Sequence, residues 1–230
     1  MRTVLLFLAL IVSIMSCSKT ENMQSGVVLP MQGFDEWEIG DEFRYQLFMG
    51  GNFLDDDNPD YTVFADTLVL EVCGITDGRF VISEKLTPNS AIFDSDDNYY
   101  YQKDSVYTNY WTIRNDSIVM EQKDDNTFNS HLFVGGVRSL SLEEFTENET
   151  ELFSWKIAEP QGNYHGDFFV RDGVINGVEY PHMNVHGNLN AMAADGPGFL
   201  YFYNREDGFI RTATISGWTG TSVGWERIPD

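Results

Sequence analysis

The stretch YTVFADTLVLEVCGITDGRFVISEKLT, residues 61–87, contains the clearest indication of the fold. Two runs of strand length, rich in aromatic and β-branched residues, flank Thr76-Asp77-Gly78, which is typical of a tight hairpin turn. A two-residue loop would place Glu71 directly opposite Glu84, and like charges in facing positions destabilise a sheet. We therefore predict an antiparallel hairpin with a three-residue loop and with Gly78 in the left-handed conformation.

The three-residue loop sets a register in which one face of the hairpin is apolar. It pairs Val72 with Ile82, and a slip of one residue would turn the apolar set outward. Leu68 then pairs with Leu86, and the apolar face consists of Leu68, Leu70, Val72, Phe80, Ile82 and Leu86. Glu84 is the one polar side chain on this face. We expect it at the sheet margin, where its carboxylate contacts water.

The chain from Phe34 onward continues this alternation of short apolar runs and turn residues. Three more hairpins are predicted, at Asn115-Asp116, Asn176-Gly177 and Glu206-Asp207-Gly208, and the second suits a type I′ turn. Hairpins at this spacing predict an all-β fold, an antiparallel meander of about ten strands that forms a barrel or a sandwich. We predict one such domain over residues 34–230.

Two local sequences add detail to this meander. A three-residue loop at Glu206–Gly208 would pair Tyr203 with Arg211, and the guanidinium would lie over the tyrosine ring. The sequence Ser141-Leu-Glu-Glu144 fits a capping box. At most one short helix is therefore predicted, within residues 139–151.

Residues 1–17, MRTVLLFLALIVSIMSC, differ from the rest of the chain. Arg2 supplies a positive charge, Val4–Met15 is apolar apart from Ser13, and the small residue Ser16 precedes Cys17. This layout is typical of a secretory signal, and its apolar run is shorter than the ~20 residues that span a bilayer. Its ending resembles the lipobox of bacterial lipoproteins.

That resemblance implies a processing scheme and a location. In this family the chain is cut before the cysteine and the cysteine is lipidated, so residues 1–16 would be removed and Cys17 would anchor the protein. Ser18–Gly33 would form a flexible tether. The residue after the cysteine is not the aspartate that retains lipoproteins at the inner membrane, so export to the outer membrane is favoured. The alternative is an ordinary secretory signal that leaves Cys17 as a free thiol, because Met15 is not small.

The composition excludes several partners. The 230 residues include 36 acidic and 14 basic side chains, for a net charge of −22. Such a surface repels nucleic acid and anionic headgroups. We therefore expect no nucleic-acid partner, and we expect the protein to contact the membrane through its lipid anchor. Cys17 and Cys73 are the two cysteines, so a lipidated Cys17 leaves no internal disulfide. Cys73 lies in the apolar run LVLEVCGI, where we expect it to pack as a small hydrophobic residue.

Metal sites have little support in the sequence. Asp94, Asp96 and Asn98 occupy the first three ligand positions of an EF-hand loop and are candidate calcium ligands, but the required glycine and glutamate do not follow. His182 and His186 have the spacing of a helical zinc pair, yet their surroundings indicate a strand, which would separate them by ~13 Å. We predict no cofactor apart from this weak calcium motif.

Aromatic residues form the most concrete candidate binding surface. Because neighbouring side chains in a strand point to opposite faces, adjacent aromatics cannot all enter one core. Some must face outward or pack against another element. An outward platform able to bind a ligand is predicted from Tyr100, Tyr110, Trp111, Tyr201 and Tyr203.

No assembled catalytic set is evident in the sequence. There is no Gly-x-Ser-x-Gly elbow, and no spacing singles out a glycosidase-type pair among the many carboxylates. We therefore favour a non-catalytic envelope lipoprotein whose β domain binds a glycan, a lipid or a protein. The alternatives are a carboxylate-based glycan hydrolase and a structural subunit of an envelope complex. An open lumen lined by tyrosine and tryptophan would favour binding, and two inward carboxylates ~5–9 Å apart would favour hydrolysis.

Overall fold

The computed structural model describes the β-rich part of the chain in eight stretches. These are residues 33–52, 60–89, 106–122, 129–133, 139–143, 167–188, 198–215 and 222–229. Cys17 and residues 1–32 lie outside them. Within the described stretches, no helix is long and apolar enough to cross a bilayer.

The described elements are one turn of 3₁₀ helix and eleven strands. They are η1 (Phe34–Glu36), β1 (Glu42–Asn52), β2 (Asp60–Thr76), β3 (Arg79–Thr87), β4 (Val106–Ile113), β5 (Ser117–Gln122), β6 (Ser139–Ser141), β7 (Asp167–Ile175), β8 (Val178–Asn188), β9 (Gly198–Asn204), β10 (Gly208–Ile215) and β11 (Ser222–Arg227). The short helix predicted within 139–151 begins instead as strand β6, and residues 144–151 lie outside the described residues.

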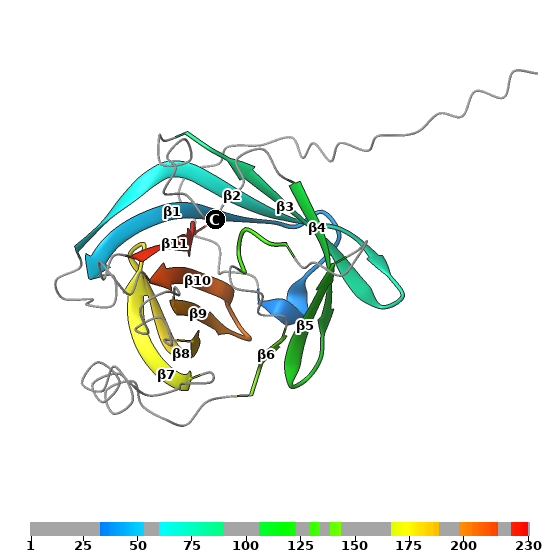
Figure 1. Ribbon diagram of the computed structural model, residues 1–230. Coiled ribbons are helices and arrows are strands. Elements are labelled where there is room, and N and C mark those ends of the chain that lie inside the picture. Colours follow the sequence, from blue (N-terminus) through cyan, green and yellow to red (C-terminus); the bar gives the residue numbers. More distant parts are fainter. Residues whose placement is uncertain are drawn as a thin grey trace, which may run out of the picture.

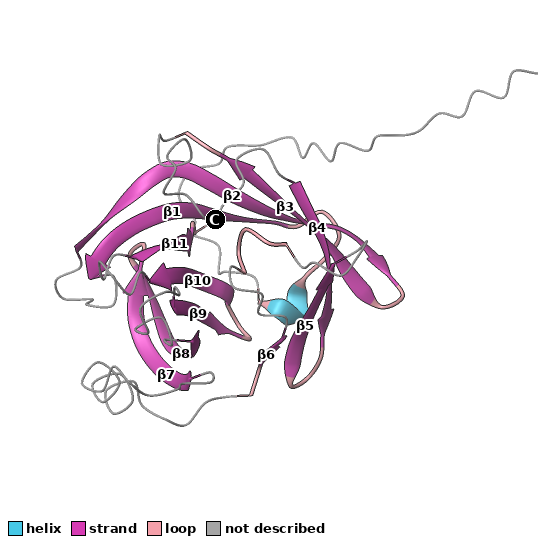
Figure 2. Cartoon of the chain, viewed as in Figure 1, coloured by secondary structure: helices cyan, strands magenta, loops and turns pink. Residues whose placement is uncertain are grey.

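The strands form a single antiparallel sheet in the order β6-β5-β4-β3-β2-β1-β11-β10-β9-β8-β7. Two runs of sequential hairpins, β1 to β6 and β7 to β11, are joined where the last strand pairs with the first. The sheet curls into a half-barrel with η1 inside its curve (Figures 1 and 2). The predicted all-β antiparallel meander is confirmed, and its strands leave β6 and β7 as the two ends of the sheet.

The β2–β3 hairpin has the predicted register but not the predicted loop. Val72 pairs with Ile82, while Thr76 pairs with Arg79, so the loop has two residues. Both loop residues have positive φ, 52° at Asp77 and 74° at Gly78, as a type I′ turn requires. A bulge between Val72 and Gly74 adds one residue to β2 and compensates for the shorter loop. The like-charge pair that argued against a two-residue loop is thereby avoided.

The other predicted hairpins form as well. Asn176 and Gly177 have φ of 53° and 77°, which confirms the type I′ turn between β7 and β8. At the β9–β10 turn, a bulge between Phe209 and Arg211 shifts the pairing, so Tyr203 faces Phe209 and Arg211 faces Phe202. The predicted pair of Tyr203 with Arg211 is therefore wrong.

One core fills the inside of the curved sheet. The rings of Trp111, Phe133, Tyr201 and Phe209 lie at its centre. The ring centroid of Phe133 lies 4.8–5.5 Å from the centroids of the other three. Phe34 of η1 and Trp37, which follows it, close the same core, where Phe34 contacts Phe209. In the described part of the barrel, these rings occupy the space where a ligand-binding lumen would lie.

A second core lies on the opposite face of the sheet. Successive residues of β9 alternate between the two, so Tyr201 enters the first core and Phe202 the second. The tip of the β7–β8 hairpin covers this face, since Asn176 accepts a hydrogen bond from Gln46 of β1 (2.7 Å) and donates one to the main-chain oxygen of Arg227 of β11 (2.7 Å). Both faces of the central strands are therefore buried.

Candidate functional site

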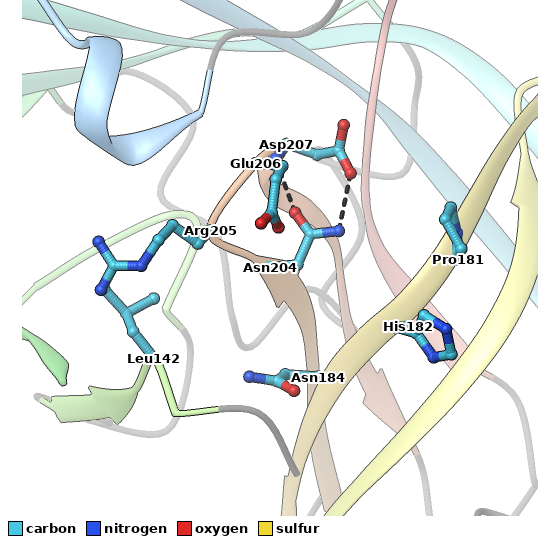
Figure 3. A pocket seen from close by; sticks show the side chains of 8 residues that line it. All are labelled: Leu142, Pro181, His182, Asn184, Asn204, Arg205, Glu206 and Asp207. Atoms are coloured by element: carbon cyan, nitrogen blue, oxygen red, sulfur yellow. Dashed lines mark hydrogen bonds between the residues drawn. The ribbon is translucent and has the colours of Figure 1, made fainter. Parts of the chain in front are cut away.

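A pocket of about 430 Å³ lies where the two ends of the sheet approach each other. Its wall combines residues from the end of β6, from β8 and from the β9–β10 turn (Figure 3). The lining residues are Leu142, Pro181, His182, Asn184, Asn204, Arg205, Glu206 and Asp207. We call it the seam pocket. Its volume falls within the range of ~300–1,000 Å³ typical of small-molecule sites.

The β9–β10 turn holds one carboxylate of the pocket in a fixed position. The Asp207 main-chain nitrogen donates to Asn204 Oδ1 (2.6 Å), and Asn204 Nδ2 donates to Asp207 Oδ2 (2.7 Å) (Figure 3). The Asp207 main-chain oxygen also accepts a hydrogen bond from Arg227 Nη1. The neighbouring Glu206 is exposed. The turn thus presents two carboxylates, one of them tied to an amide.

Arg205 connects the same turn to η1 and to the β4–β5 turn. Its guanidinium forms an ion pair with Asp35 of η1 (Nη1–Oδ1, 2.7 Å) and donates to the main-chain oxygens of Arg114 and Asn115. Its own main-chain oxygen accepts from the Phe34 nitrogen (3.0 Å). The positive charge of Arg205 is thus paired with Asp35, and the carboxylates of the turn leave the pocket with acidic character.

A bulge shapes the β8 wall of the pocket. Arg171 pairs with Met183 and Gly173 with Tyr180, so Asp172 faces two residues, Pro181 and His182. A regular strand presents every second residue to one face, whereas here Pro181 and His182 both line the pocket. Bulges of this kind commonly redirect side chains next to functional sites.

His182 has a left-handed backbone, with φ of 54°. Its main-chain nitrogen donates to Asp172 Oδ1 (2.8 Å), and its ring Nδ1 lies 3.7 Å from the same oxygen. Both side chains are mostly exposed, 70% for the histidine and 75% for the aspartate. The carboxylate of Asp172 therefore holds the strained backbone of His182 by a hydrogen bond and lies near one side of its imidazole.

Asn184 connects β8 to the segment that follows β6 at the wall of the pocket. Its side chain is 4% exposed, and Nδ2 donates to the main-chain oxygen of Glu143 (2.9 Å), just beyond β6. Leu142, the residue before Glu143, supplies an apolar part of the wall together with Pro181. The pocket is thus built at the junction of the two runs of hairpins.

Glu84, which we expected at the sheet margin, is completely buried. Its carboxylate accepts hydrogen bonds from Asn109 Nδ2, Ser130 Oγ and the main-chain nitrogens of His131 and Leu132, at 2.7–3.2 Å. Desolvation raises the pKa of this carboxyl, although each of the four donors acts to lower it. The expected exposure was wrong because residues 129–133 fold over this part of β3 and place two side chains in the core.

A second buried charge, Arg211, is paired with Glu226 on the opposite face. Arg211 Nη2 lies 2.7 Å from Glu226 Oε2 and 3.1 Å from the Tyr61 hydroxyl. The guanidinium carbon lies 5.1 Å from the ring centroid of Phe48 and 5.3 Å from that of Tyr61. Burial raises the pKa of Tyr61. This pair lies beside the second core and contributes no lining residue to the seam pocket.

The aromatic residues predicted to bind a ligand occupy different environments. Trp111, Tyr201 and Tyr203 are buried in the first core and do not form an outward platform, because residues 129–133 and η1 cover that face. Tyr110 is half-buried, with the Arg79 guanidinium 4.5 Å from its ring centroid. Tyr100 lies outside the described residues.

The predicted calcium ligands Asp94, Asp96 and Asn98 lie outside the described residues. His182 and His186 both lie in β8, so the strand predicted for them is confirmed. Across the described stretches, no group of three or more His, Cys, Asp or Glu side chains is arranged to hold a metal ion.

Cys73 is exposed, so the prediction that it packs as a core residue is wrong. It is the extra residue of the β2 bulge. A bulge interrupts the alternation of a strand, which is why the apolar neighbours of Cys73 in the sequence did not indicate its environment.

The sequence indicates two parts of the seam pocket but not their proximity. Glu206-Asp207-Gly208 was recognised as a turn, and His182 was considered as a metal ligand. The β8 bulge was missed, and Pro181 inside a strand sequence is the signal that could have indicated it, because proline interrupts the hydrogen bonds of a regular ladder. Comparison of the chain with protein-family models, with curated proteins and with solved structures found no match.

Proposed function

We propose that the chain is an exported, lipid-anchored envelope protein whose β domain binds a ligand in the seam pocket without chemical conversion. The lipobox-like sequence that ends at Cys17 supports the location. The observation that supports binding is the pocket itself, where β8 and the β9–β10 turn bring five amide, carboxylate and imidazole groups around one concave space that Leu142 closes from a third segment. A concave space on which polar groups converge is the usual starting point for a binding-site hypothesis.

The barrel interior is a poorer candidate for this ligand. The first core is packed with aromatic rings at contact distance, including Trp111 and Phe209 (5.4 Å). A lipid chain would need an apolar channel, and only Leu142 and Pro181 supply apolar side chains to the seam pocket. A hydrophilic ligand in the seam pocket therefore fits the described part of the molecule better than a lipid in a lumen.

Glycan hydrolysis is the second candidate, because two carboxylates, Glu206 and Asp207, line the same pocket. Glycosidases use such a pair, with one carboxyl acting as acid and the other as base or nucleophile. The Asp207 carboxylate accepts a hydrogen bond from the side-chain amide of Asn204 (Figure 3). We favour binding because the Asp207 carboxylate is already held by an amide of the protein.

Binding of the soluble fragment 18–230 to a glycan array and to lipid vesicles tests this proposal. Glu206→Gln and Asp207→Asn should weaken binding, whereas Glu179→Gln, at an exposed position outside the pocket, should not. Hydrolysis that is abolished by either pocket substitution would replace our proposal with the hydrolase. Binding only to another envelope protein would favour the structural role.

The location is tested separately by Cys17→Ser. This change should abolish incorporation of radiolabelled fatty acid and release the protein from the membrane in soluble form. A variant that stays labelled and membrane-bound would contradict the lipobox interpretation.

A further inference from the structure

We infer that the ligand of the seam pocket is a neutral polyhydroxylated compound, such as a segment of an uncharged saccharide, and that His182, oriented by Asp172, determines its specificity. This inference rests on the proposed function and names the ligand class that the pocket would take. Three properties of the pocket carry it: the kind of polar group in its wall, the sign of its charge, and the unusual backbone of one lining residue.

The polar groups of the wall are suited to hydroxyl groups. Carboxylates only accept hydrogen bonds, side-chain amides donate and accept, and a neutral imidazole does one at each nitrogen. A hydroxyl group both donates and accepts, so it can satisfy any of these partners. Glu206, Asp207 and Asn204 lie together on the turn, and His182 lies on the facing strand. A ligand with several adjacent hydroxyls can therefore bond to both walls.

The charge of the pocket disfavours acidic ligands. Glu206 and Asp207 line it directly, Asp172 stands behind His182, and the one lining cation, Arg205, is paired with Asp35. The whole chain carries a net charge of −22, which adds to the repulsion of anions. Phosphorylated, sulfated and carboxylated saccharides are thus disfavoured relative to neutral ones.

A cationic ligand also fits less well than a neutral one. Asp207 and Asp172 already accept hydrogen bonds, from Asn204 and from the His182 main chain respectively. Among the eight lining residues, the imidazole is the one aromatic ring, whereas sites for organic cations typically surround the charge with aromatic faces. The carboxylate, amide and imidazole groups of the wall are better matched to the hydroxyl groups of a neutral ligand.

The backbone of His182 indicates that its side chain is retained for recognition. A residue other than glycine with a left-handed backbone is strained, and such strain clusters at functional sites. Two other such residues, Asp77 and Asn176, form two-residue hairpin turns that require positive φ. His182 lies inside β8, where a glycine would satisfy the bulge without strain. The chain therefore keeps an imidazole at the pocket wall although this strains the backbone of residue 182.

Asp172 is the positioning residue for this imidazole. Its carboxylate oxygen accepts a hydrogen bond from the His182 main chain (2.8 Å) and lies 3.7 Å from ring Nδ1. By fixing the backbone of His182 with a hydrogen bond, Asp172 sets the position from which the imidazole can reach a ligand hydroxyl, and its negative charge lies beside the ring. Asp172→Asn keeps an acceptor for the main chain but removes the charge beside the ring.

The test compares His182→Gly with Asp77→Gly in the full chain. Both replace a left-handed residue by glycine, but Asp77 lies on the β2–β3 turn and does not line the pocket. We expect the melting temperature of His182→Gly to stay equal to or above that of the unmodified chain. Its affinity for neutral oligosaccharides should fall about tenfold or more, as expected for loss of a specific hydrogen bond. Asp77→Gly should bind normally.

The probes are neutral gluco-, manno- and galacto-oligosaccharides, oligogalacturonate as the acidic set and chitosan oligomers as the cationic set, titrated by calorimetry at millimolar concentration. We expect the neutral set to bind best and Asp172→Asn to weaken it without lowering the melting temperature. Tighter binding of an acidic or cationic probe, lost in Glu206→Gln, overturns this inference but leaves the proposed function standing. Neutral binding that is unchanged in His182→Gly overturns the role of His182. No binding of any probe overturns both proposals.

Discussion

Replacement of Glu84 by glutamine tests how residues 129–133 are held against the barrel. The carboxylate is fully buried and accepts hydrogen bonds at both oxygens. Oε1 accepts from Asn109 Nδ2 (2.8 Å), while Oε2 accepts from the main-chain nitrogens of His131 (2.7 Å) and Leu132 (3.2 Å). Glu84→Gln keeps the shape of the side chain but turns one of these two acceptors into a donor.

The magnitude follows from the contacts that glutamine cannot make. If its oxygen stays with the two main-chain nitrogens, its amide nitrogen meets the donor of Asn109, so at least one buried donor loses its acceptor. A buried donor without a partner costs about 1–3 kcal/mol. At ~2–4 °C per kcal/mol for a domain of this size, the melting temperature should fall by about 2–12 °C. Glu179→Gln, at an exposed position, should change stability by no more than ~0.5 kcal/mol.

The pH dependence supplies a second readout. Burial raises the pKa of Glu84 in the folded state above its usual value of 4.5, so the folded chain binds this proton more tightly than the unfolded chain. The stability from that proton is complete below the unfolded pKa and is lost as pH rises through the folded pKa. The advantage of the unmodified chain over Glu84→Gln should therefore shrink as pH increases from about 4 upward.

Thermal unfolding followed by circular dichroism, from acid to neutral pH, measures both effects. Amide hydrogen exchange at His131 and Leu132 should also accelerate in Glu84→Gln. If this variant has the same melting temperature as the Glu179→Gln control at every pH, the carboxylate does not hold residues 129–133. If its difference from the unmodified chain grows with rising pH, the direction of the pKa shift is wrong.

Three further substitutions or labels test the packing. Arg211→Met should destabilise the fold by about 3–5 kcal/mol, because it removes the cation that is paired with the buried Glu226. Adding Glu226→Leu should restore part of that loss. Equal stability of the single and double variants in urea would contradict this prediction. Gly224→Ala should cost at least about 3 kcal/mol, since a Cβ there would lie 1.9 Å from a main-chain oxygen, whereas the matched Gly74→Ala meets nothing within 4 Å and should unfold at nearly the same urea concentration as the unmodified chain. Cys73 should react with a maleimide in the folded protein, and labelling that requires denaturant would show that this thiol is covered.

Register was predictable from the sequence where one face of a hairpin is apolar. In residues 61–87, a slip would expose the whole apolar set, so the pairing of Val72 with Ile82 is determined by burial alone. Loop length was not predictable in the same way. A bulge at Cys73 lengthens one strand by a residue and gives the same register with a shorter loop.

The error at Glu84 and the error at the aromatic residues have one physical cause. Alternation within a strand shows which side chains share a face, but not what covers that face. Residues 129–133 cover Glu84, and the tip of the β7–β8 hairpin covers the second face of the central strands. In β9, neighbouring Tyr201 and Phe202 are both buried for this reason, so neither needed to face outward.

The seam pocket could be predicted only in parts. Its turn residues have a recognisable hairpin signature, and Pro181 marks an irregular strand. Leu142 precedes Pro181 by a long stretch of chain and approaches it because the two ends of an eleven-stranded sheet curl toward each other. That curvature depends on how two cores fill opposite faces, which no single segment of the sequence reveals.

Hydrogen-exchange mapping of the full chain with the best-binding neutral oligosaccharide tests the central claim most directly. If the seam pocket is the binding site, protection on binding should concentrate at Leu142–Glu143, at Pro181–Asn184 and at Asn204–Asp207, and it should disappear in His182→Gly. Protection confined to β4 and β5, around Tyr110, would place the ligand on the opposite arm of the sheet and contradict the account.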